Sequence, residues 1–276
     1  MPVRGAIAVI ANARGLGPAV LLGCACALVG APAGVLAGAW TLPQGSGLMI
    51  DTLYGWTGEG APWGGNKGVD QTRFDAQAYF EYGLTDALTI FGQTALESYS
   101  LRPPTPNVYH GFDYSDLGLR ARLWSTGQWV FSGEATIFMP GAHEPAAPAQ
   151  AGDTGRAGEG HLLAGTNFAL GQWPGFLDAE FGYRLRTAGP PDEWHADLTV
   201  GLKPAPGVML MLQDFTTFST ATANQNFPAW RSSVVEASVV VPLVDRWSIQ
   251  VGLFSSVLAV KTNTERGVAL SVWRTF

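Results

Sequence analysis

Hydrophobic and polar residues alternate with a period of two along most of the chain. From Phe74 to Leu84 the even positions are apolar or aromatic, whereas the odd positions include Asp75, Gln77 and Glu81. Successive side chains of a strand point to opposite sides, so this pattern predicts a strand with one apolar and one polar face. The same alternation predicts twelve strands, at residues 47–56, 74–84, 88–99, 116–124, 129–139, 162–170, 177–186, 194–203, 208–218, 232–241, 247–253 and 267–276.

The connections between these strands alternate in length. Short connections lie at residues 84–87, 125–128, 172–175, 204–207 and 244–246. Longer connections lie at residues 57–71, 100–111, 141–160, 187–193, 219–230 and 260–266. Outer-membrane barrels have short periplasmic turns and longer external loops. The sequence therefore predicts an all-β fold, a transmembrane up-and-down antiparallel β-barrel of about twelve strands with both ends on the short-turn side.

Periodicity alone fits a soluble barrel or sandwich equally well, so the tryptophans decide which face meets lipid. They are expected near the short turns (Trp124, Trp129, Trp173, Trp247 and Trp273) and near the long loops (Trp56, Trp194 and Trp230). Two aromatic girdles are typical of a barrel that crosses lipid headgroups. The chain also ends at Phe276 on an amphipathic strand, which resembles the assembly signal of outer-membrane barrels, although Arg274 departs from it. Outer-membrane lipid and the barrel-assembly machinery are therefore the expected partners.

The first 39 residues have the composition of a secretory signal peptide. Arg4 and Arg14 precede an apolar run that ends in Ala37-Gly38-Ala39. A basic start, an apolar middle and a small-residue end predict cleavage after Ala39, with cleavage after Ala33 as the alternative. A transmembrane anchor is the competing interpretation. We expect a cleaved signal peptide at residues 1–39, a barrel domain at residues 40–276 and export to the outer membrane of a Gram-negative bacterium.

Composition excludes several classes of function. Sixteen Lys and Arg against 22 Asp and Glu give a net charge of −6, without a basic cluster. Nucleic-acid surfaces need clustered cations, so no nucleic-acid partner is expected. Both cysteines, Cys24 and Cys26, lie in the predicted signal peptide. The mature chain would then have neither disulfides nor cysteine-bound metals.

Two short stretches resemble a known family. Residues 79–89 read Tyr-Phe-Glu-Tyr-Gly-Leu-Thr-Asp-Ala-Leu-Thr, and residues 39–47 read Ala-Trp-Thr-Leu-Pro-Gln-Gly-Ser-Gly. Both are similar to the outer-membrane barrel family of the MetA pathway of phenol degradation. The resemblance implies a transporter of hydrophobic or aromatic compounds, and it assigns no functional residue.

The sequence offers little that indicates catalysis or metal binding. Outer-membrane phospholipases carry a His and a Ser two residues apart on a strand, and no His-x-Ser occurs here. His195 is the one histidine expected on a strand, close to Asp197; without a fixed nucleophile, a hydrogen bond in the lumen is the favoured role. His110, His143 and His161 are expected in or beside loops. The pairs His143-Glu144 and Glu159-Gly160-His161 lack the spacing of a helical metal motif. We expect no enzyme, no cofactor and no metal.

The polar strand faces are the candidate functional feature. The residues expected to line the lumen are Asp75, Gln77, Tyr79, Glu81, Gln93, Glu97, Arg120, Arg122, Glu134, Asp178, Glu180, Arg184, Arg186, His195, Asp197, Lys203, Glu236 and Gln250. Arg120 and Arg122 are expected between the strands of Glu97 and Glu134. These charges either select solutes in an open pore or form a salt-bridged filling. The loop at 141–160 is either a surface loop or a lid.

Three functions follow, in order of preference. The first is a porin-like channel or transporter for passive passage of small solutes, including hydrophobic or aromatic compounds. The second is a sealed structural or binding barrel of the cell surface, and the third is an outer-membrane hydrolase.

Overall fold

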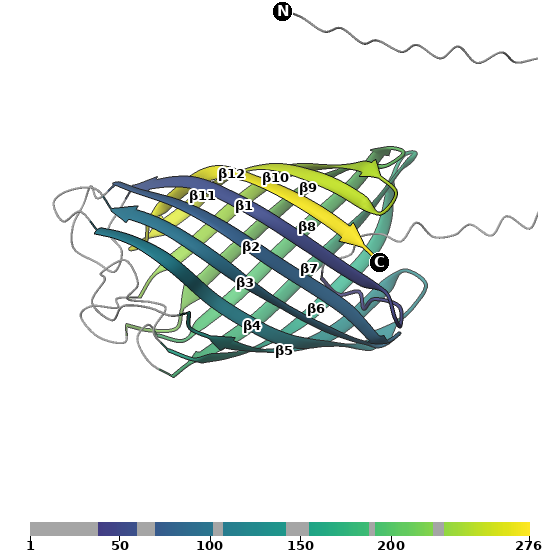
Figure 1. Cartoon of the computed structure of the whole chain (residues 1–276). Coiled ribbons are helices and arrows are strands. Elements are labelled where there is room, and N and C mark those ends of the chain that lie inside the picture. Colours follow the sequence, from purple (N-terminus) through teal and green to yellow (C-terminus); the bar gives the residue numbers. More distant parts are fainter. Residues whose placement is uncertain (1–37, 60–69, 102–106, 142–154, 188–190, 223–228) are drawn as a thin grey trace, which may run out of the picture. The chain divides into compact units, whose positions relative to one another are not determined.

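A computed structural model describes residues 38–59, 70–101, 107–141, 155–187, 191–222 and 229–276. It contains a closed antiparallel barrel (Figure 1) with the strand order β1-β12-β11-β10-β9-β8-β7-β6-β5-β4-β3-β2. The strands are β1 (Gly47–Glu59), β2 (Asp70–Thr85), β3 (Leu88–Leu101), β4 (Asn107–Ser125), β5 (Trp129–Met139), β6 (Ala157–Leu170), β7 (Trp173–Arg186), β8 (Glu193–Ala205), β9 (Val208–Ser219), β10 (Arg231–Val244), β11 (Trp247–Val260) and β12 (Thr264–Thr275). Over these ranges, no helix is long and apolar enough to cross a membrane. The predicted twelve-stranded all-β barrel is confirmed.

Each strand pairs with its sequence neighbours, and the last strand closes the barrel against the first. In the β1–β12 ladder, Leu53 pairs with Leu270 and Trp56 pairs with Gly267. Closure leaves no strand edge unpaired, and hydrocarbon cannot satisfy a free backbone amide or carbonyl. The short turns and the C-terminal end of β12 lie at the same end of the barrel (Figure 1).

The two faces of the barrel differ sharply in chemistry. Exposed side chains on the outer face include Leu53, Phe74 and Leu253, at 59%, 62% and 64% exposure. The opposite positions bury Glu81 and Arg120, at 0% and 4% exposure. A water-soluble barrel has the reverse arrangement, because apolar groups leave water on folding. The barrel is therefore apolar outside and polar inside, as barrels that span lipid are.

Several strands are longer than the sequence predicts, and the predicted loops are shorter. β4 begins at Asn107 rather than at residue 116, because a register shift opposite Thr94 and Leu96 interrupts its period of two. β6 begins at Ala157 rather than at residue 162, so the predicted loop at 141–160 ends earlier. The predicted long connection at 260–266 is a tight turn at residues 261–263, where Lys261 has a φ of 56°. Most of the third loop and the predicted signal peptide up to residue 37 lie outside the described residues.

The tryptophans near the short turns lie on the outer face, with one exception. Trp124 and Trp129 are exposed and flank Phe131, with ring centroids 5.4 and 6.2 Å from it. Trp273 was predicted in this girdle, and that prediction is wrong. Its side chain is 4% exposed, and its Nε1 donates a hydrogen bond to Oε1 of Gln250 over 3.0 Å. The phase of β12 explains the difference, because the outward positions are those of Val268 and Leu270 and Trp273 lies on the opposite face.

Candidate functional site

Residues 38–46, which we call the pre-strand segment, begin inside the barrel near its short-turn end. Residues 38–42 are buried or half-buried there, whereas residues 43–45 are exposed and lie beside the β2–β3 turn. Ala39 is fully buried; its amide donates to Oδ1 of Asp178 over 2.7 Å, and its carbonyl accepts from the Ser132 hydroxyl. Nη1 of Arg120 donates to the Trp40 carbonyl over 3.2 Å. The segment therefore binds side chains of β4, β5 and β7 before the chain enters β1.

An apolar cluster surrounds the pre-strand segment. Its buried members are Leu48, Phe176, Met209, Met211, Val240 and Trp273, with Trp40, Leu42 and Ile50 packed against them. The Trp40 ring meets the Phe176 ring edge to face at a centroid distance of 6.0 Å. A Cβ at Gly165 would lie 2.5 Å from the Trp40 ring, so the glycine provides the space that the indole fills. The short-turn end is thus filled by aromatic and aliphatic side chains.

An ion-paired layer lies next to this cluster. Arg120 binds Glu81 through Nη1 at 2.9 Å and Glu134 through Nε, and its guanidinium lies 5.4 Å from the Phe91 ring centroid. Arg120 and Glu134 are direct cross-strand partners. The sequence predicts Arg120 on a strand between those of Glu97 and Glu134, with opposite charges as neighbours. The strand order is confirmed, whereas Arg120 and Glu97 are not neighbours. Both side chains lie on the inner face of their strands, as predicted. Glu97, however, pairs with Gly111 of β4, whereas Arg120 pairs with Thr89 of β3.

Glu97 instead belongs to a second ion-paired group around Arg73. The guanidinium of Arg73 lies 2.8 Å from Asp75, 3.2 Å from Glu97 and 2.6 Å from Asp113. It also lies 5.9 Å from the centroid of the Trp56 ring. One cation therefore holds carboxylates from β2, β3 and β4.

A third group joins β6, β7 and β8. Nη2 of Arg184 lies 2.7 Å from Oε2 of Glu159, and the same carboxylate binds Nε2 of His161. Nη2 of Arg186 donates to both Glu193 oxygens over 2.9 Å. Charge-assisted bonds of this kind fix side chains in place as well as neutralising them.

Three histidines lie on strands in the described part of the chain. His195 is not alone on a strand, since His110 lies on β4 and His161 on β6; His143 lies outside the described residues. Nδ1 of His195 contacts the Thr217 hydroxyl at 3.3 Å, and its Nε2 faces Glu193 at 3.4 Å. The strand character of His161 was missed because the glycines beside it were assigned to the third loop.

The remaining predicted lumen residues occupy the less exposed face of their strands, but they do not form one site. Gln77 hydrogen-bonds Gln93, the Tyr79 hydroxyl bonds Glu81, and Nε2 of Gln250 donates to Oε1 of Glu236 over 3.2 Å. Glu180 and Asp197 face the same cavity as Arg120, whereas Arg122 and Lys203 are half-buried close to the ends of their strands. Their roles in passage or in filling stay predictions.

Several cavities lie between these groups, and two of them differ in their linings. One, of about 380 Å³, is lined by charged residues of β4–β8 together with Phe138 and Phe215. The other, of about 330 Å³, is bounded by Tyr54, Trp56, Phe215, Val234 and Phe254, with Arg73, Asp75, Glu236 and Glu265 around them. Phe215 borders both cavities and keeps 40% of its surface exposed. The interior thus has two walls of different chemistry. The ionic wall consists of the charged residues of β4–β8, and the aromatic wall consists of Tyr54, Trp56, Phe215 and Phe254.

Sequence reasoning missed several interior residues, namely Arg73, Asp113, Asp116, Glu159, His161, Glu193, Phe215 and Glu265. Arg73 shares the odd phase of Asp75 and would have been found by extending that strand by one residue. The aromatic wall could not be predicted from the sequence, because an apolar residue at an inner position only interrupts the alternation of polar and apolar residues along its strand.

The fold defines the chain as an outer-membrane-type β-barrel. Among solved structures it is similar to an outer-membrane channel from Pseudomonas putida F1, with a TM-score of 0.68 and 15% identity over 86% of this chain and 98% of that one. It is also similar to the translocator domain of the autotransporter NalP from Neisseria meningitidis, with a TM-score of 0.52 and 10% identity over 83% and 88% of the two chains. No family model and no curated protein matches the chain, so the resemblance to the phenol-degradation family stays a prediction.

Proposed function

We propose that the chain is an outer-membrane channel for the passive passage of small solutes. The observation that carries the proposal is an apolar outer wall around an interior with paired charges and two cavities, of about 380 and 330 Å³. The outer wall requires lipid, since an exposed apolar surface of this extent is not compatible with a monomer in water. The similar fold of the Pseudomonas putida F1 channel supports this function.

The proposal includes export and location. We infer that the chain begins with a signal peptide that is cleaved upstream of Ala39, that the residues after the cleavage site form the barrel domain, and that the protein resides in the outer membrane of a Gram-negative bacterium. The terminal Phe276, which is 45% exposed at the end of β12, is proposed as the contact for the barrel-assembly machinery.

Small aromatic or hydrophobic compounds are the solutes that the interior favours. Tyr54 and Phe254 lie 6.1 Å apart between ring centroids, and Phe215 presents its ring to both cavities. Aromatic rings bind one another with offset or edge-to-face geometry. The opposite ionic wall would hold the polar group of such a solute. The resemblance at residues 79–89 agrees with this solute class.

We infer passage rather than a covalent reaction, because each histidine on the inner face of the described strands contacts a neighbouring polar side chain. His195 contacts Thr217 and Glu193, and His161 contacts Glu159. No described strand places a serine two residues from a histidine in the manner of the phospholipases.

A sealed structural barrel is the second candidate, and the pre-strand segment favours it. Residues 38–42 pack against buried side chains at one end of the interior. Reconstitution of the folded barrel in a planar bilayer separates the two candidates. Discrete current steps, and faster swelling of liposomes in small aromatic solutes, support the channel. A folded barrel that conducts no ions and admits no solute contradicts the channel and leaves the sealed barrel.

A further inference from the structure

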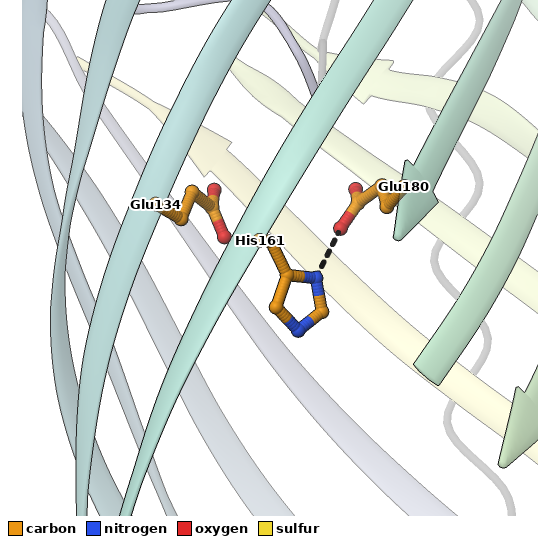
Figure 2. A group of neighbouring side chains, drawn as sticks. All are labelled: Glu134, His161 and Glu180. Atoms are coloured by element: carbon orange, nitrogen blue, oxygen red, sulfur yellow. Dashed lines mark ion pairs between the residues drawn. The ribbon is translucent and has the colours of Figure 1, made fainter. Parts of the chain in front are cut away.

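Three neighbouring strands bring a histidine and two glutamates together inside the barrel. Glu134 on β5 is the direct cross-strand partner of His161 on β6, and Glu180 on β7 lies diagonally across from His161. One oxygen or nitrogen of each side chain lies within 4.8 Å of the others. Figure 2 shows the His161 ring between the two carboxylates. The sequence did not predict this group, because its members lie on three strands and the predicted strand at 162–170 begins one residue after His161.

The His161 ring is held in one orientation from two sides. Its Nε2 is hydrogen-bonded to Oε1 of Glu159. A Cβ at Gly182 would lie 2.2 Å from Cδ2 of the ring, so the imidazole occupies space that only a glycine leaves open. A carboxylate on one ring nitrogen directs the other toward a ligand, which is the usual outer-shell arrangement of metal-binding histidines.

The other ring nitrogen faces a carboxylate at a distance that suits a shared metal ion. Nδ1 of His161 is shielded from solvent, has no hydrogen-bond partner, and lies 3.5 Å from Oε2 of Glu180. Hydrogen bonds from nitrogen to oxygen are shorter, about 2.7–3.2 Å. Two ligand atoms of a tetrahedral zinc ion with bonds of about 2.1 Å are separated by about 3.4 Å.

The surroundings favour a cation with an open coordination position. The adjoining cavity is lined by the carboxylates of Asp116, Glu134, Glu159, Asp178, Glu180 and Asp197, against the guanidinium groups of Arg120 and Arg184. The side chains of His161 and Glu180 keep 12% and 21% of their surface exposed, so an ion can reach them. An imidazole among carboxylates selects Zn²⁺ and similar first-row ions over Mg²⁺ and Ca²⁺.

We propose that Glu134, His161 and Glu180 form a binding site for a zinc-type divalent cation in the lumen. Glu159 is a positioning residue that fixes the ring, and the fourth coordination position faces the cavity, where water or a solute group completes it. The site does not depend on whether the barrel conducts.

Calorimetric titration of the folded, detergent-purified barrel with ZnCl₂ at neutral pH tests the proposal. We expect one ion per barrel, and roughly 10-fold or greater loss of affinity in His161→Gln and Glu180→Gln. His110→Gln, which changes an exposed histidine of β4, is the matched control and should bind zinc as the unmodified barrel does. Gly182→Ala should weaken binding by displacing the ring, and heat-dependent gel mobility verifies that each variant is folded.

Cobalt provides a second measurement on the same proteins. Co²⁺ in a tetrahedral site of nitrogen and oxygen ligands absorbs visible light strongly, and this absorption should be absent in His161→Gln. The proposal is overturned if the unmodified barrel binds no zinc, or if His161→Gln and Glu180→Gln bind it as tightly. His161 would then be an imidazolium that is ion-paired to Glu159 and Glu180.

Discussion

The backbone amide of Ala39 donates a hydrogen bond to Oδ1 of Asp178 across 2.7 Å, although the two residues lie 139 positions apart. Asp178 is 2% exposed, and Ser132 binds the carbonyl of the same alanine. Both polar groups of Ala39 are therefore satisfied inside the barrel. This pairing fixes the pre-strand segment to the walls formed by β5 and β7.

Removing the Asp178 carboxylate should loosen the pre-strand segment. In Asp178→Ala the buried Ala39 amide loses its acceptor, which costs about 1–3 kcal/mol for the packed position of the segment. We expect a larger and noisier single-channel conductance than that of the unmodified barrel.

Asp178→Asn is the matched control, because the amide oxygen can still accept from Ala39. It should conduct almost as the unmodified barrel does. Equal conductance of folded Asp178→Ala and the unmodified barrel would show that the segment does not restrict the pore.

The strands were predictable because lipid imposes a strict rule on their outer positions. The outer positions follow this rule and are apolar, as at Leu53, Phe74 and Leu253. Once the strands were located, the lengths of the connections between them could be read from the sequence. The extents of β4 and β6 were not predictable. A register shift in β4 breaks the period, and the glycines around His161 have no side chain to show which face they occupy.

The position of the pre-strand segment was also hidden from the sequence. Residues 38–46 have no alternation, and the small residues at their start look like the end of a leader. Their contacts with Asp178 and Ser132 join distant parts of the chain, so local patterns do not predict them. The group around Arg73 and the contact of Arg120 with Glu81 were not predicted for a related reason, since they depend on the exact register between strands.

An arginine at the centre of the outer wall should destabilise the barrel in a membrane. Leu253 is 64% exposed in the middle of β11, and an arginine at the bilayer midplane costs about 2–4 kcal/mol. We expect this loss in the free energy of unfolding of Leu253→Arg, measured by urea titration in lipid vesicles.

Leu243→Arg is the control for position along the wall. Leu243 is similarly exposed, at 58%, but lies at the end of β10, where the cost of an arginine falls to about 0–1 kcal/mol. Equal stability of the two variants would contradict a lipid-facing wall.

Arg120→Ala should affect both stability and ion selectivity. It leaves Glu81 and Glu134 without their cation in the interior. Removing one partner of a buried ion pair costs about 3–5 kcal/mol of stability, and the cost is smaller where water reaches the remaining carboxylates. We expect a lower free energy of unfolding and a reversal potential shifted toward cations in a salt gradient. Arg122→Ala, two residues along the same strand, should change both quantities less. An equal change would show that Arg120 contributes no more than Arg122 to stability and selectivity.

The aromatic wall should matter for aromatic solutes and not for sugars. Phe215 borders both cavities, so Phe215→Ala removes a ring contact worth about 0.5–1.5 kcal/mol. We expect a roughly 2- to 10-fold change in the flux of benzoate in liposome swelling, with little change for arabinose. Phe112→Ala removes a ring from the outer face, where Phe112 is 49% exposed, and should leave both fluxes unchanged. A parallel change for both solutes would assign Phe215 a steric role only.

The contacts of Ala39 bear on the site of signal cleavage. Cleavage after Ala39 would remove a residue that is fully buried and bonded to Asp178 and Ser132, whereas cleavage after Ala33 would keep it. We therefore expect the mature chain to begin upstream of Ala39, and the intact mass of the barrel purified from outer membranes will identify its first residue. Ser132→Ala provides an independent check. It should lower the free energy of unfolding by about 1 kcal/mol if Ala39 is retained. A mature chain that begins at Trp40 would contradict this expectation and would place a free amino group beside Asp178.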